Sequence, residues 1–361
     1  FKENLQNNNF ENNGIVYIGM DAGWAKMSDE QLADIARHCK ANGQKAGIYF
    51  TPFSDWGRDP EAYINGSSGY KCKDAYLYAN GKTQNMVAGG LAMDPTHPAI
   101  KERIRETAER FKRLGYEYIK IDFLTHGCAE ADYYYDPEVQ TGMQAYNKGM
   151  AYLLEQMEGM YITMAISPLF PSQYAHSRRI ACDAWAGIGD TEYTLNSLTY
   201  GWWLNQVYTY NDPDHLLLEP VSDGENRARI TSGVITGIFM NGDDLSCISG
   251  IQVAKDKARK FLTNKDINAI AKMGKSFRPV SGNMDGADFL FMHDTGKEVY
   301  LAAFNYSGYD LTYDLPLSRL GLRESSTYKA KELWSGKEVK FKKNVRVCIP
   351  KKDVLVFRIT R

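Results

Sequence analysis

The stretch that decides the fold is Glu117-Tyr-Ile-Lys-Ile-Asp122, a short run rich in aromatic and β-branched residues. Its composition predicts a strand that ends on a carboxylate. A helical pattern that opens with Pro98 and ends near Gly115 leads directly into it. Because side chains alternate along a strand, Lys120 and Asp122 point to the same side. A helix followed by such a strand is the unit from which parallel α/β sheets are built.

The same alternation of short apolar runs and helical patterns extends on both sides of this stretch. The predicted strands are residues 15–20, 45–50, 117–122, 161–165, 179–183, 215–218 and 237–241. The first two predicted helices begin at Ser28, which opens a capping box, and at Pro98. Three further helices are predicted at 138–157, 191–207 and 227–235. Seven strands are one short of a closed (β/α)8 TIM barrel. Residues 1–10 have a helical pattern, so we expect the first strand to precede residue 1.

From about Phe289 the pattern changes to short alternating segments separated by turns. These segments are 289–293, 298–305, 329–333, 345–349 and 354–359. Alternation of this kind is typical of an antiparallel β-sandwich. The sequence therefore predicts an N-terminally incomplete catalytic barrel at 1–279 and a C-terminal sandwich at 280–361.

Composition narrows the classes of partner. The chain has 43 Lys and Arg against 44 Asp and Glu and no basic cluster, so neither nucleic acid nor an anionic membrane is an expected partner. No apolar run reaches the roughly 18 residues that a membrane-spanning helix needs. The 24 tyrosines and 6 tryptophans suit a sugar, whose apolar faces and polar edges meet one surface, although protein cores also take up aromatic residues.

Metal and cofactor signals are weak. The six cysteines form no CxxC pair and the six histidines no HxH or HExxH pattern. No glycine-rich loop of the kinds that bind nucleotides or phosphates occurs either. We therefore expect catalysis without a metal and without an organic cofactor.

In a barrel, catalytic groups gather at the carboxyl ends of the strands. The polar residues at those positions are mostly carboxylates: Asp21, Thr51, Asp55, Lys120, Asp122, Ser167, Asp183, Asp190, Asp212, Asp214, Asp243 and Asp244. Converging carboxylates without a metal or phosphate signal fit glycoside hydrolysis, in which one carboxylate attacks the anomeric carbon and another donates and recovers a proton.

Lys120-Ile-Asp122 is the sharpest local motif, because a cation beside Asp122 would hold its carboxylate ionised, as a nucleophile requires. The alternative interpretation is a buried Lys–Asp pair that only ties the barrel together. Asp190 is ambiguous too, since it also suits the N-cap of a helix over 191–207.

The order of several motifs adds a family resemblance. Met20-Asp-Ala-Gly-Trp24, Lys45-Ala-Gly-Ile-Tyr49, Tyr118-Ile-Lys-Ile-Asp122, Cys182-Asp-Ala-Trp185 and Asn211-Asp-Pro-Asp214 resemble, in order and spacing, segments of the melibiase-like clan of α-galactosidases and α-N-acetylgalactosaminidases. Further similarity runs through Gly237-Ile-Phe-Met-Asn241 and into Glu332-Leu-Trp-Ser-Gly336 of the predicted sandwich. The resemblance implies a retaining glycoside hydrolase.

Carried over residue by residue, the resemblance makes Asp122 the nucleophile and Asp190 the acid/base, with Asp183 as the alternative acid/base. It makes Lys120 a ligand of sugar hydroxyls and Asp21 a ligand of the hydroxyls at C4 and C6. The remaining expected substrate contacts are Trp24, Tyr49, Ser167, Trp185 and Asp214.

The chain also departs from the family pattern. Ala22 stands where a second acidic residue usually lies beside Asp21, and Ala186 stands where an arginine often lies. Ile166 or Ser167 occupies the position that reads the 2-substituent, and Ala165 stands where the usual disulfide partner of Cys182 would be. The expected substrate is an oligosaccharide or polysaccharide with a terminal α-galactoside.

Three alternatives stay open at this point. The first is an α-glycosidase of the same clan that releases isomaltose or cleaves α-N-acetylgalactosaminides. The second is a sugar-binding barrel without catalysis, against which the presence of Asp122, Asp190 and Lys120 argues. The third is a barrel that handles phosphosugars, which the lack of a glycine-rich phosphate loop near the last strands disfavours.

Overall fold

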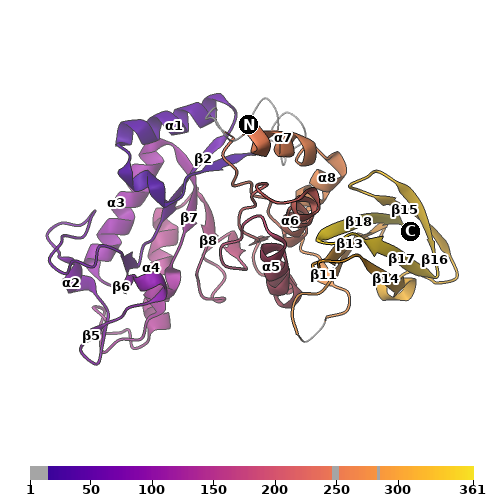
Figure 1. The fold of residues 1–361 in the computed structure, drawn as a ribbon. Coiled ribbons are helices and arrows are strands. Elements are labelled where there is room, and N and C mark those ends of the chain that lie inside the picture. The colour runs from indigo at the N-terminus through magenta and orange to yellow at the C-terminus, as the bar shows by residue number, and fades with distance from the viewer. Residues whose placement is uncertain (1–14, 246–251, 283–284) are drawn as a thin grey trace. The chain divides into compact units, whose positions relative to one another are not determined.

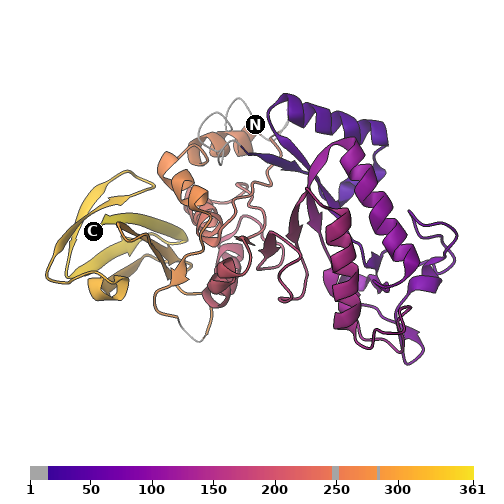
Figure 2. The ribbon, with the colours of Figure 1, turned by 180° about the vertical axis from the view of Figure 1, so that it is seen from behind.

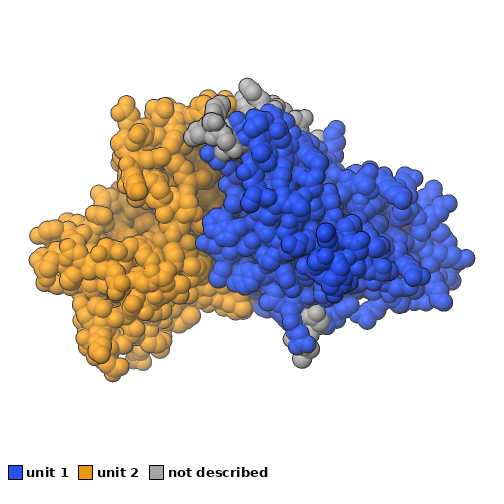
Figure 3. Space-filling view, in the orientation of Figure 1, with its two compact units in different colours: residues 1–14, 179–361 blue, residues 15–178 orange. Residues whose placement is uncertain are grey.

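The computed structural model describes residues 15–245, 252–282 and 285–361 (Figure 1). The expected helix at residues 1–10 lies outside the described residues. The chain forms two compact units: unit 2 is Ile15–Arg178, and the described part of unit 1 begins at Arg179 (Figure 3).

Unit 2 is built on a parallel sheet. Strands β1 (Tyr17–Gly19), β2 (Lys45–Phe50), β7 (Tyr116–Ile121) and β8 (Tyr161–Met164) lie side by side in that order, and the edge of β8 pairs with β9 (Ser177–Arg179) through Thr163 and Ser177. The strands lie within two residues of their predicted bounds, apart from β9, which ends where a strand at 179–183 was expected to begin.

Three helices alternate with these strands: α1 (Asp29–Ala41), α3 (Pro98–Leu114) and α4 (Gly142–Gln156). They cover one face of the sheet (Figures 1 and 2). The capping box at Ser28 and Gln31 opens α1 as predicted. Gly115, with a φ of 95°, ends α3 in a left-handed conformation that glycine adopts at little cost, and the chain enters β7 at the next residue.

A long connection between β2 and α3 was not predicted. It contains β3 (Ser54–Asp55), α2 (Cys72–Ala75), β4 (Tyr78–Ala79), β5 (Lys82–Thr83), η3 (Val87–Gly89) and β6 (Leu91–Ala92). The Asp55 carboxylate holds its first turn by accepting hydrogen bonds from the backbone of Gly57 and Arg58 and from the Tyr76 hydroxyl. Elements of two to four residues carry too little periodicity for a sequence pattern to reveal them.

The first part of unit 1 is mainly helical. Its elements are α5 (Ile188–Gly201), η5 (Trp202–Gln206), β10 (Tyr210–Asp212), α6 (Asp223–Thr236), α7 (Gln252–Phe261) and α8 (Lys265–Met273). Two strand predictions were wrong here: 215–218 and 237–241 form only isolated bridges, Asn211 with Gly237 and Leu216 with Asn241. Asp214 has a φ of 67°, and this left-handed residue interrupts the extended chain.

The second part of unit 1 is an antiparallel sheet in the order β11-β12-β13-β18-β15-β16-β17-β14. Its strands are β11 (Arg278–Pro279), β12 (Leu290–Asp294), β13 (Glu298–Asn305), β14 (Leu311–Pro316), β15 (Thr327–Glu332), β16 (Glu338–Lys342), β17 (Asn344–Ile349) and β18 (Asp353–Thr360). Strands β14 and β16 were not predicted, because most of their side chains are exposed or half-buried and the apolar alternation is weak.

Alternate residues of β13 belong to two different cores. Val299, Leu301 and Ala303 belong to a core formed within residues 280–359, mostly by the strands. Ala302 and Phe304 point the other way and pack with residues of α5, α6 and α8. Polar contacts also join these helices to the strands, since Arg227 on α6 pairs with Asp353 and the Trp334 indole N–H donates to Thr231 at 3.1 Å. Over residues 15–245, 252–282 and 285–361, no helix has the length and apolar character needed to cross a membrane.

Candidate active site

Asp122 follows the last residue of β7, where the carboxyl ends of the parallel strands lie. Its side chain is buried, with 5% of its surface exposed. The backbone N–H of Phe123 donates to Asp122 Oδ1 at 2.7 Å, and the N–H of Asp122 donates to the carbonyl of Phe50 at the end of β2. Phe123 has a φ of 54°, so the chain turns sharply just beyond the carboxylate. Asp122 is therefore fixed at the end of β7.

Lys120 and Asp21 form an ion pair next to this position. Lys120 Nζ lies 2.7 Å from Asp21 Oδ2, and Asp21 Oδ1 accepts the N–H of Ala22. The ammonium also lies 5.3 Å from the ring centroid of Tyr49, in cation–π contact. Asp21, Tyr49 and Lys120 thus come from the ends of three neighbouring strands, β1, β2 and β7, and lie together.

Trp24 packs toward the helices of unit 2. Its indole N–H donates to the Tyr49 carbonyl at 2.7 Å, and its ring meets Phe111 of α3 edge to face, with centroids 5.1 Å apart. The Arg110 guanidinium lies over the same ring. These contacts fix Trp24 against α3, and its role as a sugar contact stays a prediction.

Ser167 lies in the loop after β8 and is buried. Its hydroxyl makes no hydrogen bond to any described residue. The preceding Ile166 has a φ of 38°, a strained conformation for a β-branched residue. A buried hydroxyl left unpaired costs about 1–3 kcal/mol, so a polar ligand group at this place would be favoured.

Asp214 in unit 1 is a buried carboxylate with several partners. It is 4% exposed and lies 3.5 Å from Arg179 and 3.3 Å from His215, and the Ala184 N–H donates to it at 2.9 Å. Burial alone would raise its pKa, but the hydrogen bond from His215 and the charge of Arg179 outweigh burial and lower the pKa to about 2. Asp183, the alternative acid/base, pairs with the same Arg179 and has an exposed side chain.

Arg229 on α6 was not singled out in the sequence and is fully buried. Its guanidinium donates to the carbonyls of Trp185, Pro213 and His215. Burial lowers its pKa to about 10. Arg229 and Asp214 together hold both ends of the short segment from Ala184 to Trp185. No sequence pattern could have marked Arg229, because an arginine on a helix is normally a surface residue.

Asp190 lies in the first turn of α5, which begins at Ile188 and not at residue 191. The interpretation of Asp190 as an N-cap was therefore wrong by three residues: the N-cap is Gly187, and Asp190 is the third residue of the helix. Its Oδ2 accepts the N–H of Gly187 at 3.1 Å, which is the reciprocal half of a capping box. Trp185, three residues before the helix, is half exposed and packs edge to face on His215.

Comparison with known proteins identifies the architecture. Residues 290–359 match the family model of the α-galactosidase C-terminal β-sandwich domain. A β-L-arabinopyranosidase of Geobacillus stearothermophilus, solved with arabinose, superposes with a TM-score of 0.73 over 100% of this chain and 91% of its own, at 13% identity. The chain has the melibiase-like fold. The expected TIM barrel with a C-terminal β-sandwich is thereby confirmed.

Other proteins with the melibiase-like fold differ in what their names say they act on. A protein of Bacillus halodurans described as a putative α-N-acetylgalactosaminidase superposes with a TM-score of 0.68 at 14% identity and covers 99% of this chain and 90% of its own. The isomaltodextranase of Arthrobacter globiformis, complexed with panose, superposes with a TM-score of 0.63 at 17% identity, over 96% of this chain and 66% of its own.

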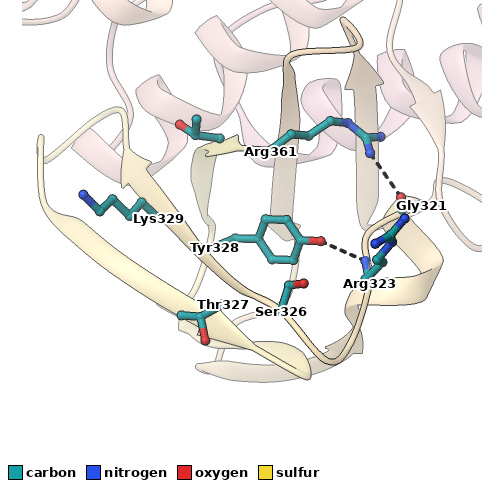
Figure 4. Close-up of a pocket in the computed structure, with 8 residues that line it drawn as sticks. Gly321, Arg323, Ser326, Thr327, Tyr328, Lys329 and Arg361 are labelled. Atoms are coloured by element: carbon teal, nitrogen blue, oxygen red, sulfur yellow. Dashed lines mark hydrogen bonds between the residues drawn. The ribbon is translucent and has the colours of Figure 1, made fainter.

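The sandwich of this melibiase-like fold carries a surface hollow of about 490 Å³ (Figure 4). Tyr328 lies in it and accepts the N–H of Arg323, while Arg361 donates to the carbonyl of Gly321. Its lining has arginine and lysine side chains and no carboxylate, so it does not offer the acid and nucleophile that glycoside hydrolysis needs. Over the described parts of the chain, no group of three or more His, Cys, Asp or Glu side chains is arranged to hold a metal ion.

Proposed function

We propose that the protein is a retaining α-glycoside hydrolase that removes a terminal sugar of galactose configuration from an oligosaccharide or polysaccharide. The observation that carries the proposal is Asp122, a buried carboxylate fixed at the end of β7 beside the Lys120–Asp21 pair. Barrel enzymes carry their catalytic groups at this end of their strands. The melibiase-like fold supports the reaction class.

In the first step Asp122 attacks the anomeric carbon. A bond forms between its carboxylate oxygen and C1, the bond from C1 to the leaving oxygen breaks, and Asp190 gives its proton to that oxygen. The Phe123 N–H donates to Asp122 Oδ1 at 2.7 Å and so fixes the orientation of the carboxylate before attack. A buried position restricts water around the nucleophile, which strengthens its electrostatic interactions.

In the second step Asp190 accepts a proton from water, the water oxygen bonds to C1, and the ester bond to Asp122 breaks. Asp122 is thereby returned as a carboxylate and Asp190 as an acid. Asp183 is the alternative acid/base, and its pairing with Arg179 counts against it, because that ion pair already engages the carboxylate.

The sugar is inferred from the groups beside Asp122. Asp21 and Lys120 offer an acceptor and a donor for adjacent ring hydroxyls, and the unpaired Ser167 hydroxyl offers a further contact. Ala22 adds no polar group beside Asp21. β-L-Arabinopyranose has the ring configuration of α-D-galactopyranose without its C6 carbon. An arabinopyranosidase among the structural relatives therefore supports a substrate of galactose configuration whose C6 hydroxymethyl group contributes little to binding.

A screen of 4-nitrophenyl glycosides tests the proposal. The panel contains α-D-galactoside, β-L-arabinopyranoside, α-N-acetylgalactosaminide and α-glucoside, with Asp122→Ala as the negative control. We expect release of nitrophenol from the first two substrates by the wild-type protein and none by the variant. Binding of free galactose in calorimetry without turnover of any glycoside would instead identify a non-catalytic sugar-binding protein.

A further inference from the structure

Trp56 is an exposed aromatic side chain at the rim of the candidate site. It lies in the connection that follows β2, five residues after Thr51, and 40% of its surface is exposed. Its ring meets Phe123 edge to face, with centroids 4.6 Å apart. Phe123 is the residue whose N–H binds Asp122. The exposed indole thus contacts the residue that directly follows the proposed nucleophile in the chain.

The indole is held in place on several sides. Its N–H donates to Thr51 Oγ1 at 3.2 Å, and the buried His126 packs near it with centroids 5.9 Å apart. A Cβ on Gly90 would come within 3.0 Å of the far end of the indole, so the bare backbone of Gly90 closes that side. Because the ring is already fixed, a ligand that stacks on it loses little conformational entropy from the protein.

Depth along the strand decides which part of a substrate Trp56 would meet. The backbone of Lys120 precedes that of Asp122 by two residues and therefore lies about 7 Å further from the end of β7. A sugar whose hydroxyls reach the Lys120–Asp21 pair would therefore lie toward the strand interior, on the inner side of Asp122. Phe123 and Trp56 follow the strand ends, so they lie on the outer side of Asp122, where the leaving group departs.

We propose that Trp56 is the stacking platform for the leaving-group sugar, which makes the enzyme selective for substrates whose second unit is itself a pyranose. This inference rests on the proposed function and adds the class of leaving group. The fixed indole leaves 40% of the residue exposed, and a pyranose ring offers an apolar face of C–H groups that can pack on such a surface, with polar groups at its edge.

The test compares two substrates that share the cleaved sugar and differ in the leaving group. For galactose these are α-galactosyl fluoride, whose fluoride cannot stack, and melibiose, whose leaving group is glucose. Trp56→Ala should lower kcat/KM for melibiose about tenfold and leave kcat/KM for the fluoride within about twofold of wild type. Trp56→Phe should recover most of the loss. Tyr63→Ala, an exposed aromatic residue of the same connection, should change neither value.

Each other outcome overturns the inference. Equal losses on both substrates would mean that Trp56 only supports Phe123 and the geometry of Asp122. No loss on melibiose would mean that the leaving group does not touch the indole. A wild-type protein that cleaves neither substrate, nor any glycoside of the aryl panel, would refute the proposed function itself, and the inference would fall with it.

Discussion

Lys120 on β7 reaches over Tyr49 of β2 to Asp21 at the end of β1, and its ammonium nitrogen lies 2.7 Å from the carboxylate. The pair spans three strands at the place where the nucleophile is expected. Its side chains are 22% and 64% exposed, so water screens the interaction, and such pairs contribute less than about 1 kcal/mol to stability. The pair is therefore better suited to bind substrate than to hold the barrel together.

A double-mutant cycle separates the two roles. Lys120→Met and Asp21→Asn should each lower kcat/KM about tenfold or more, since each would remove a charged hydrogen bond that we propose to the sugar. The coupling energy in the free energy of unfolding should stay below about 1 kcal/mol. Steady-state kinetics and urea unfolding of the four proteins measure both quantities. A large coupling in stability with unchanged kinetics would support the purely structural interpretation.

Asp122→Asn should abolish turnover and leave the fold intact. An amide is too weak a nucleophile to form the glycosyl ester, but it has nearly the same shape and can still accept the Phe123 N–H. Circular dichroism and the thermal midpoint should match wild type while nitrophenol release disappears. Hydrolysis at the wild-type rate would require a different nucleophile.

Asp214 should make stability depend on pH in the acid range. Its folded pKa, about 2, lies below the ordinary value of 3.8, so its contribution is fully present above about pH 4 and is lost as the pH falls toward 2. The shift corresponds to about 2 kcal/mol. The difference in stability between wild type and Asp214→Asn, measured by urea unfolding, should shrink from pH 6 to pH 2.5.

The matched control for that experiment is Asp34→Asn on α1, where the carboxylate is 76% exposed and pairs only with Arg37 among the bonds described for it. Its difference from wild type should stay small and nearly independent of pH. A pH-independent difference for Asp214→Asn as well would show that the ionised form of Asp214 is not what the fold stabilises.

Discrimination between galactose and arabinopyranose should be weak. A missing polar partner for one hydroxyl costs about 0.5–1.5 kcal/mol, so kcat/KM for the nitrophenyl α-galactoside and β-L-arabinopyranoside should agree within about tenfold. Ala22→Asp, which adds an acceptor beside Asp21, should shift the ratio toward the galactoside. A strict preference of wild type for the galactoside would mean that other residues read C6.

The first product should retain the anomeric configuration. A carboxylate that attacks carbon directly gives two inversions and hence net retention, whereas a carboxylate that activates water gives one. Proton NMR in the first minutes of hydrolysis distinguishes them, because the α and β anomeric signals differ and mutarotation is slower. A β-galactose signal that appears first would reassign Asp122 as a general base.

The sequence by itself determined the elements that have strong local signals. Lys45–Phe50 and Glu298–Asn305 were predicted to the residue, because their apolar character is continuous or regularly alternating. The capping residues Ser28 and Gly115 marked helix ends for the same local reason. The motif Lys120-Ile-Asp122 also follows from the sequence, since alternation along one strand places both side chains on one side.

Only the tertiary structure decided the partners of these groups. The ion pair of Lys120 with Asp21 joins residues 99 positions apart, and the burial of Arg229 among carbonyl groups depends on segments that no local pattern relates. The position of Trp56 near Asp122 was likewise decided by the tertiary structure, through the contact of Trp56 with Phe123. Local propensity depends on neighbours in the chain, whereas charge pairing, burial and ring packing depend on distances that exist only after the chain has folded.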